Sequence, residues 1–261
     1  FFDTGLDILA DAAQNSSFDE SELEREVGVI QEEIKRGKDD PSRETTIKLF
    51  ETAFNAHPYR RPIIGTKESV ASFEREDVLN FFNKHYVAEN TTLVVSGDFE
   101  PAYAREKIEE QFGGFDGKSY ERAERAQESE QNEIRSFVNA RELKQSHLRV
   151  GYRIPEATHE DIPAIDVLSV IMGHGEASHL HRAIYRRREL VNSIRASAFT
   201  PKDNGLLIVS ASYQADDESR HETVIDSLIE EIYRFRLADV TEKELDRAKT
   251  IIESQEVYGQ Q

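Results

Sequence analysis

The sequence predicts an α+β fold made of two homologous domains, and three observations support this prediction. Segments with helical spacing of apolar residues alternate with short β-branched segments along the 261 residues. A polar stretch at residues 116–134 has little to bury and is typical of a linker. Two helical segments on either side of this stretch have similar sequences. We therefore expect a first domain over residues 1–115 and a second over residues 135–261.

The two similar segments are residues 18–33 and residues 240–255. The identical positions pair Glu20 with Glu242, Glu22 with Glu244, Leu23 with Leu245, Arg25 with Arg247 and Ile30 with Ile252. Repeats so far apart favour a duplicated domain, although two acidic helices with similar caps would also match in this way. If the duplication is real, each domain is incomplete here. The chain then holds the back of the first domain and the front of the second.

The first half is predicted to be rich in helices. Apolar spacing, caps and breakers place helices at about residues 6–13, 19–35, 43–55, 75–85 and 101–112, and a strand at residues 91–95. Asp19 lies three positions before Glu22, the order that a capping box uses, which fixes the start of the second helix.

The second half is predicted to mix strands and helices. Strands are expected at residues 135–141, 148–154, 193–199 and 206–212. Helices are expected at about residues 159–171, 178–188, 222–236 and 241–256. This half is therefore α+β as well.

Composition excludes several classes of partner and site. With 33 Lys and Arg against 51 Asp and Glu, the net charge of −18 repels nucleic acids and anionic lipids, and attracts cationic peptides or simply keeps the chain soluble. The absence of Cys excludes disulfides, thiolate metal sites and a Cys nucleophile. The apolar runs are far shorter than the ~18 residues of a membrane helix, so we expect no membrane insertion. A soluble chain of this kind suits a bacterial periplasm or cytoplasm, and the compartment stays open.

Two glutamates of the second helix have a distinctive position. Its apolar stripe is formed by Leu23, Val27, Ile30 and Ile34, at 100° per residue. Glu26 and Glu33 are seven residues apart and fall on one line at the edge of this stripe. Carboxylates that become buried need a metal ion, a partner or a proton. The matching residues of the second segment are Ala248 and Gln255, so the acidic pair occurs once, which fits a chemical role; an exposed acidic flank is the alternative.

Short motifs follow one another in order along nearly the whole chain. They are Ser17–Asp19, Glu24–Glu26, His57–Tyr59, Gly65–Thr66, Val94–Asp98, Gly173–Gly175, Ser178 with Leu180, and Thr200–Leu206. With these motifs the chain resembles the pitrilysin/insulinase family of zinc metallopeptidases, which includes mitochondrial processing peptidases and bacterial zinc proteases. The resemblance implies metallopeptidase-like domains in which helices pack on one face of a mainly antiparallel sheet.

The resemblance also implies a zinc site. Family members hold zinc with two His of an inverted H-x-x-E-H motif and with a Glu from a later helix. Glu33 matches that metal ligand, and Glu26 matches a supporting carboxylate of the same helix. A catalytic zinc has three protein ligands and one open position for water, and a nearby carboxylate can orient a ligating His.

The chain departs from the family in lacking H-x-x-E-H. None of its eight His residues lies in that motif, and the family spacing would place the motif before Phe1. In the second domain the same spacing leads to His179, where Arg182 and Ala183 replace the Glu and the second His. We therefore expect the second domain to be non-catalytic and the chain to carry at most one zinc ligand.

These features predict a fragment of a zinc-dependent metalloendopeptidase that hydrolyses peptides, with the fragment alone inactive. Zinc would be the cofactor of the intact parent protein, and peptides would be its substrates. Self-association, or pairing with the missing domain halves, is expected at the incomplete sheets. A non-catalytic structural or regulatory subunit of the same family is the alternative, and an acidic protein-interaction module is a second one.

Overall fold

The computed structural model describes residues 1–116, 120–214 and 218–259. Residues 117–119 of the expected linker, and residues 215–217 and 260–261 of the expected second domain, lie outside the described residues. The chain forms two compact units. Unit 1 consists of Phe1–Gly37 and Pro62–Ala126, and unit 2 consists of Lys38–Arg61 and Gln127–Gln261.

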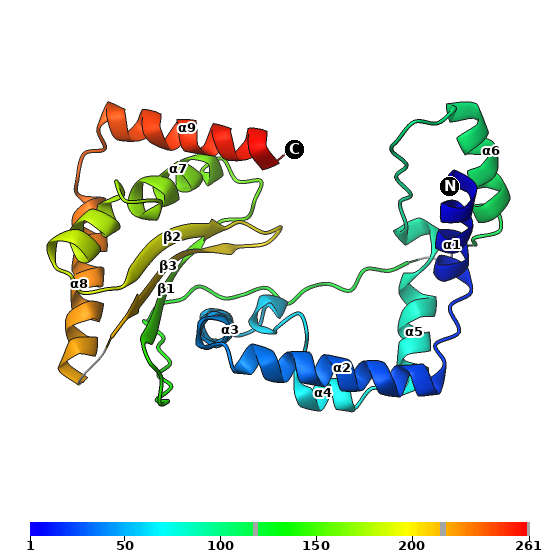
Figure 1. Cartoon of the computed structure of the whole chain (residues 1–261), viewed down its shortest axis with the longest axis horizontal. Helices are drawn as coiled ribbons and strands as arrows, with labels where there is room; N and C mark the ends of the chain where they lie inside the picture. Colours follow the sequence, from blue (N-terminus) through cyan, green and yellow to red (C-terminus); the bar gives the residue numbers. More distant parts are fainter. Residues whose placement is uncertain (117–119, 215–217, 260–261) are drawn as a thin grey trace. The chain divides into compact units, whose positions relative to one another are not determined.

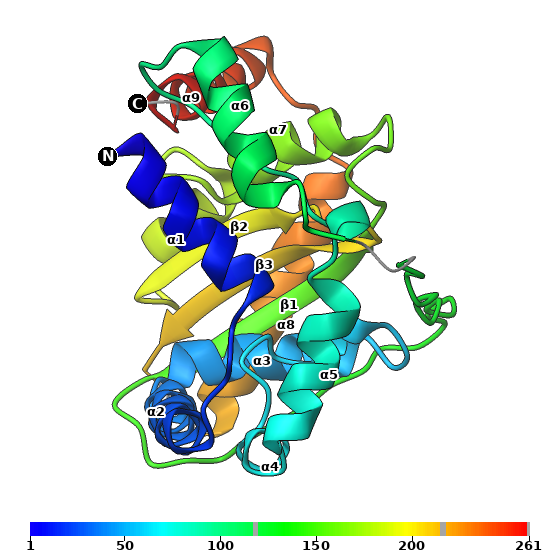
Figure 2. The same cartoon turned by 90° about the vertical axis from the view of Figure 1, so that its right-hand side faces the viewer.

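Unit 1 is helical in its described residues. Its helices are α1 (Phe2–Gln14), α2 (Glu20–Lys38, whose last residue belongs to unit 2), α4 (Lys67–Ala71), α5 (Arg75–His85) and α6 (Pro101–Phe112), with a 3-10 turn η2 (Ala88–Asn90). Helices α1 and α6 lie side by side (Figures 1 and 2), and the Gln14 side-chain amide donates to the Gln111 carbonyl at 3.0 Å. The turn before α2 is tied to α5, because Arg75 donates to the carbonyl oxygens of Ser17 and Phe18.

The start of α2 agrees with its predicted cap. The Asp19 carboxylate accepts from the backbone N–H of Ser21 at 2.9 Å and from that of Glu22 at 3.4 Å. These hydrogen bonds, with that of the Ser21 hydroxyl first, lower the pKa of Asp19. They satisfy N–H groups that have no partner within the helix.

The strand predicted at residues 91–95 is absent, so that prediction is wrong. A strand requires a neighbour to take its backbone hydrogen bonds, and no described segment pairs with these residues. Val94 is 81% exposed, as expected for a β-branched segment without a sheet to join. Local composition indicates a preference for extended backbone but specifies no partner strand.

Unit 2 contains an antiparallel sheet whose three described strands have the order β1-β3-β2. The strands are β1 (Ser146–Ile154), β2 (Ser193–Phe199) and β3 (Gly205–Tyr213). The helices are α3 (Pro41–Ala53), α7 (Ile162–Gly173), α8 (Glu218–Arg236) and α9 (Glu242–Gly259), with a 3-10 turn η1 (Pro58–Arg60) and a π-helix η3 (His181–Arg187). The predicted α+β class is confirmed.

The core of unit 2 lies between the sheet and its helices. Figure 1 shows α7 and α9 on one side of the sheet and α3 on the other. Val150, Val209 and Ala196 share one rung and pack toward α7 with buried side chains of η3, α8 and α9. At Gly173 an added Cβ would lie 2.0 Å from the backbone nitrogen of Ala196, so only glycine lets α7 end this close to β2.

The strand predicted at residues 135–141 is also absent. These residues are held by side chains against the end of α2 and the start of α3: Arg141 donates to the carbonyl of Lys38 at 3.1 Å, and Asn139 donates to the Glu44 carboxylate at 3.2 Å. Guanidinium and amide contacts thus replace the backbone pairing that a strand would need. The helix predicted at residues 159–171 begins later, at Ile162, with Pro163 in its first turn.

Candidate functional site

The predicted metal ligand and its supporting carboxylate both lie on α2. Glu26 and Glu33 are exposed, while Ile34 of the predicted stripe is buried and Leu23 is partly buried. Neither glutamate forms an ion pair or hydrogen bond with a described residue. Their burial, expected from the helical wheel, is not seen in the described chain, and both carboxylates are free to accept a ligand or a partner.

Glu33 lines an open hollow of about 640 Å³ along α2. The other lining residues are Arg25, Gly28, Val29, Glu32 and Arg36. Val29 lines the same hollow as Glu33 and is 60% exposed, so the hollow also offers an apolar side chain to a ligand. The hollow therefore combines one free carboxylate with cations and an apolar contact.

The described residues hold no group of three or more His, Asp or Glu that is close enough to bind a metal ion. Glu33 offers an oxygen ligand of the type that zinc accepts. A catalytic zinc needs three protein ligands, so this donor set fits one part of a zinc site and not a complete one. The two His ligands that the resemblance implies have no counterpart near Glu33 among the described residues.

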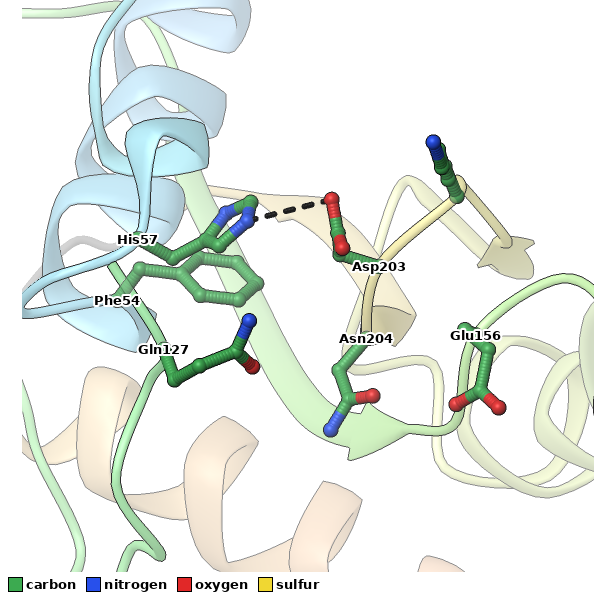
Figure 3. Close-up of a pocket in the computed structure, with 7 residues that line it drawn as sticks. Phe54, His57, Gln127, Glu156, Asp203 and Asn204 are labelled. Carbon is green, nitrogen blue, oxygen red and sulfur yellow. Dashed lines mark ion pairs between the residues drawn. The ribbon is translucent and has the colours of Figure 1, made fainter. Parts of the chain in front are cut away.

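A second candidate site surrounds His57 (Figure 3). His57 is 4% exposed; its Nδ1 accepts from the Tyr59 backbone N–H at 3.3 Å, so its Nε2 carries the hydrogen. This Nε2 lies 3.4 Å from Oδ2 of Asp203, and the two side chains face each other in Figure 3. The pocket of about 180 Å³ beside them is lined by Phe54, His57, Gln127, Glu156, Lys202, Asp203 and Asn204.

The turn that carries His57 is fixed by Glu128. This carboxylate accepts from the backbone N–H groups of Asn55, Ala56 and His57 at 2.8, 2.7 and 2.9 Å, and pairs with Arg153 at 3.0 Å. Burial opposes its charge, but the three N–H groups and Arg153 together lower the pKa of Glu128 to about 2. Sequence reasoning missed this residue, because it stands in a charge-rich segment predicted to be a linker.

His179 is engaged by α9. Its Nε2 lies 2.9 Å from Oε1 of Glu244, and Arg182 donates to the same oxygen at 2.8 Å. Hydrogen bonds from Thr241, first the hydroxyl and then the backbone N–H, together with Arg182 and His179, lower the pKa of Glu244 to about 2. His179 is thus engaged by a carboxylate that also pairs with Arg182, and it is not a free metal ligand.

Comparison with known families identifies the chain. Residues 72–252 match the family model described as the Peptidase M16 inactive domain, and residues 2–67 match the model described as Insulinase (Peptidase family M16). The chain belongs to peptidase family M16. The predicted resemblance to the pitrilysin/insulinase family is therefore confirmed, and most of this M16 chain corresponds to a domain of the inactive type.

Known M16 relatives agree with this assignment. The chain is 27% identical over 246 residues to an uncharacterized zinc protease, YmxG, of Bacillus subtilis, covering 94% of this chain and 58% of that protein. It is 30% identical over 262 residues to an uncharacterized zinc protease of Rickettsia felis, covering 99% and 61%. The chain thus spans about three fifths of the length of these relatives.

The fold of the M16 chain matches solved structures. A protease from Helicobacter pylori superposes with a TM-score of 0.88 at 21% identity, over 98% of this chain and 63% of that one. At this identity the similarity shows the fold alone. No helix among the described residues is long and apolar enough to cross a membrane.

Proposed function

We propose that the M16 chain is part of a zinc-dependent endopeptidase that hydrolyses peptides. In this proposal Glu33 is a metal ligand and Glu26 is a positioning residue for the metal-binding side chains. The observation that carries the proposal is that α2, within the residues that match the Insulinase model, holds both carboxylates seven residues apart and without partners among the described residues. The zinc proteases among the curated relatives support it.

The roles of the two glutamates follow from the chemistry of a three-ligand zinc. When bound, the metal supplies a Lewis acid and an activated water. The Glu33 carboxylate would supply one anionic oxygen ligand from α2, and two His ligands would come from outside this chain. The Glu26 carboxylate would accept a hydrogen bond from the ring N–H of such a His and so hold its orientation. We therefore propose that residues 1–261 alone are inactive.

The predicted division into domains stands as part of this proposal. Residues 1–115 would belong to the catalytic-type domain, residues 116–134 would link the domains, and residues 135–261 would belong to the non-catalytic one. The caps of the two similar helices support a duplication. Asp19 caps α2, and at the matching position Thr241 exchanges hydrogen bonds with Glu244 at the start of α9.

The proposal is tested on the intact parent protein by measuring zinc content and peptide cleavage in the same samples. We expect about one zinc per wild-type chain, as the three-ligand site requires. Glu33→Gln should lose zinc and cleavage together, because an amide is a weaker ligand than a carboxylate. Glu32→Gln, an exposed neighbour that lines the same hollow, is the matched control and should retain both. Equal zinc in the wild type and Glu33→Gln would refute the assignment.

A non-catalytic subunit is the second candidate function. It is favoured by the match of residues 72–252 to an inactive domain and by the hydrogen bond between His179 and Glu244. An intact parent that folds but neither binds zinc nor cleaves peptides would support this candidate instead.

A further inference from the structure

One face of the sheet in unit 2 is polar and carries two arginines. The register places Arg149 of β1, Ser210 of β3 and Arg195 of β2 on a single rung across the sheet. The next rung on this face consists of His147, Ser212 and Ser193. We call these six residues the cationic face. The opposite face of the same strands is apolar and packs into the core.

Helix α3 covers only one end of this side of the sheet (Figure 1). Leu49 of α3 lies against Gly151, and Phe54 packs with Leu206 and Ile208. Arg195 and Ser193, on β2, are exposed. The cationic face therefore remains open on its β2 side within unit 2.

Arg149 is a positioned cation. Its Nη1 donates to the Ser210 hydroxyl at 2.5 Å, and its Nη2 donates to the carbonyl and hydroxyl oxygens of Ser42 at 2.9 and 2.8 Å. All three acceptors are neutral, and no described carboxylate forms an ion pair with Arg149. Its Nε is buried without a hydrogen-bond partner among the described residues. The hydrogen bonds fix the guanidinium in place and leave its charge uncompensated.

Arg195 adds a second positive charge. It is exposed and forms no ion pair or hydrogen bond with a described residue. Burial and then Arg195 lower the pKa of Arg149, and Asp40 opposes them with a smaller effect. The Asp40 carboxylate is engaged at the start of α3, where it accepts from the N–H groups of Ser42 and Arg43. Positive charge thus dominates this small region of an acidic chain.

We propose that the cationic face binds the carboxylates of an extended acidic peptide. Arg195 would form an exposed ion pair with a peptide carboxylate, and the positive charge of Arg149 would attract the same group electrostatically. Ser193 and Ser212 would offer hydroxyl groups as hydrogen-bond donors to the peptide. The spacing supports an extended peptide, because successive rungs on one face of a strand lie about 6.8 Å apart and so do alternate side chains of an extended chain. Arginine suits carboxylates because its planar fork can donate two parallel hydrogen bonds.

The overall charge of the chain sharpens the choice of ligand. A net charge of −18 repels an acidic peptide everywhere except where cations are grouped and unpaired. Binding would therefore be local and sensitive to single residues of the cationic face. The proposal concerns unit 2 alone and needs no metal at Glu33, so it can fail or hold independently of the proposed peptidase function.

The test measures binding of two fluorescent peptides to the purified 261-residue chain by anisotropy. One peptide alternates Glu with Thr, and the other has Gln in place of each Glu. We expect the Glu peptide to bind about tenfold more tightly, the scale of one charge-assisted hydrogen-bonded pair. Arg195→Gln should abolish most of that difference, and Arg195→Lys should retain part of it. Added salt should reduce the difference.

Arg186→Gln is the matched control. It changes the net charge by the same amount as Arg195→Gln does. The arginine that it removes lies in η3, away from the cationic face, where it is exposed and pairs with Glu176. The preference for the Glu peptide should survive in this variant. Equal binding of the two peptides, or an equal loss in Arg186→Gln and Arg195→Gln with both variants folded by circular dichroism, would overturn the proposal. Tighter binding of inorganic phosphate than of the Glu peptide would overturn the choice of a peptide as the occupant.

Discussion

Replacing Glu128 by Gln should destabilise unit 2 strongly. Its carboxylate is 7% exposed and accepts three backbone N–H groups besides pairing with Arg153, whereas an amide would leave that guanidinium unpaired. The fall of the pKa from 4.5 to about 2 corresponds to about 3 kcal/mol of folding free energy at pH 7. We expect Glu128→Gln to lower the free energy of unfolding by roughly 2–4 kcal/mol in urea titrations.

The pH dependence gives this prediction a specific sign. The folded-state pKa of Glu128 lies below the unfolded one, so the contribution is complete above about pH 5 and is lost as the pH falls toward 2. The difference between wild type and Glu128→Gln should therefore shrink by about 1 kcal/mol between pH 7 and pH 3.5. Glu130→Gln, an exposed neighbour, is the control and should change stability little. Equal losses in the two variants, or a loss from Glu128→Gln that does not change with pH, would refute the reasoning.

Three further predictions concern two glycines and association. Gly173→Ala should lower the melting temperature of the chain. Its Cβ would lie 2.0 Å from a backbone nitrogen of β2, so α7 must move away, and the free-energy cost should exceed the ~1–3 kcal/mol usual for a small-to-large substitution. Gly28→Ala, on an exposed turn of α2 with no atom within 4 Å, should instead stabilise it by about 0.5–1 kcal/mol, and a loss there would contradict the packing described. Because β1 and β2 are edge strands in the described sheet, we expect a mass that rises with concentration in sedimentation equilibrium, and a constant monomer mass would exclude self-association.

Local signals in the sequence were sufficient for most helices. The predicted bounds of α5 and α6 agree with the structure, because each has a strong start, with Glu74 and Asp77 at the first and Pro101 at the second. Strand β2 was also predicted with the observed bounds, and its neighbours β1 and β3 to within two residues. The boundaries of these elements are set by a few adjacent residues, so the sequence alone is sufficient to predict them.

Contacts between distant residues were not predictable in this way. The strands expected at residues 91–95 and 135–141 failed because their pairing depends on segments elsewhere, which composition does not specify. Glu128 went unnoticed because its three N–H donors come from more than 70 residues earlier in the chain. A polar stretch can therefore connect elements and also hold a fold together. The part of it that includes Glu128 packs within unit 2, as residues 38–61 do.

A comparison of α2 with α9 distinguishes residues that stabilise the fold from residues that the proposed chemistry requires. Both begin with a capped acidic turn, which stabilises a helix whatever its function. Glu26 of α2 corresponds to Ala248 of α9, which is fully buried in the core of unit 2. One turn before Ala248, Glu244 holds His179, the residue that family spacing aligns with the first His of the zinc motif.

In unit 2, His179 thus lies next to α9. It is engaged by the Glu244 carboxylate, whereas a metal site would require further ligands beside it. If the two domains are copies, the equivalent contact in the first one would be made by Glu22, which the alignment pairs with Glu244 and which lies one turn before Glu26. A carboxylate that must meet a metal-bound His cannot be paired within its own helix, and neither Glu26 nor Glu33 forms such a pair among the described residues. This supports Glu33 as the ligand and Glu26 as its positioning residue.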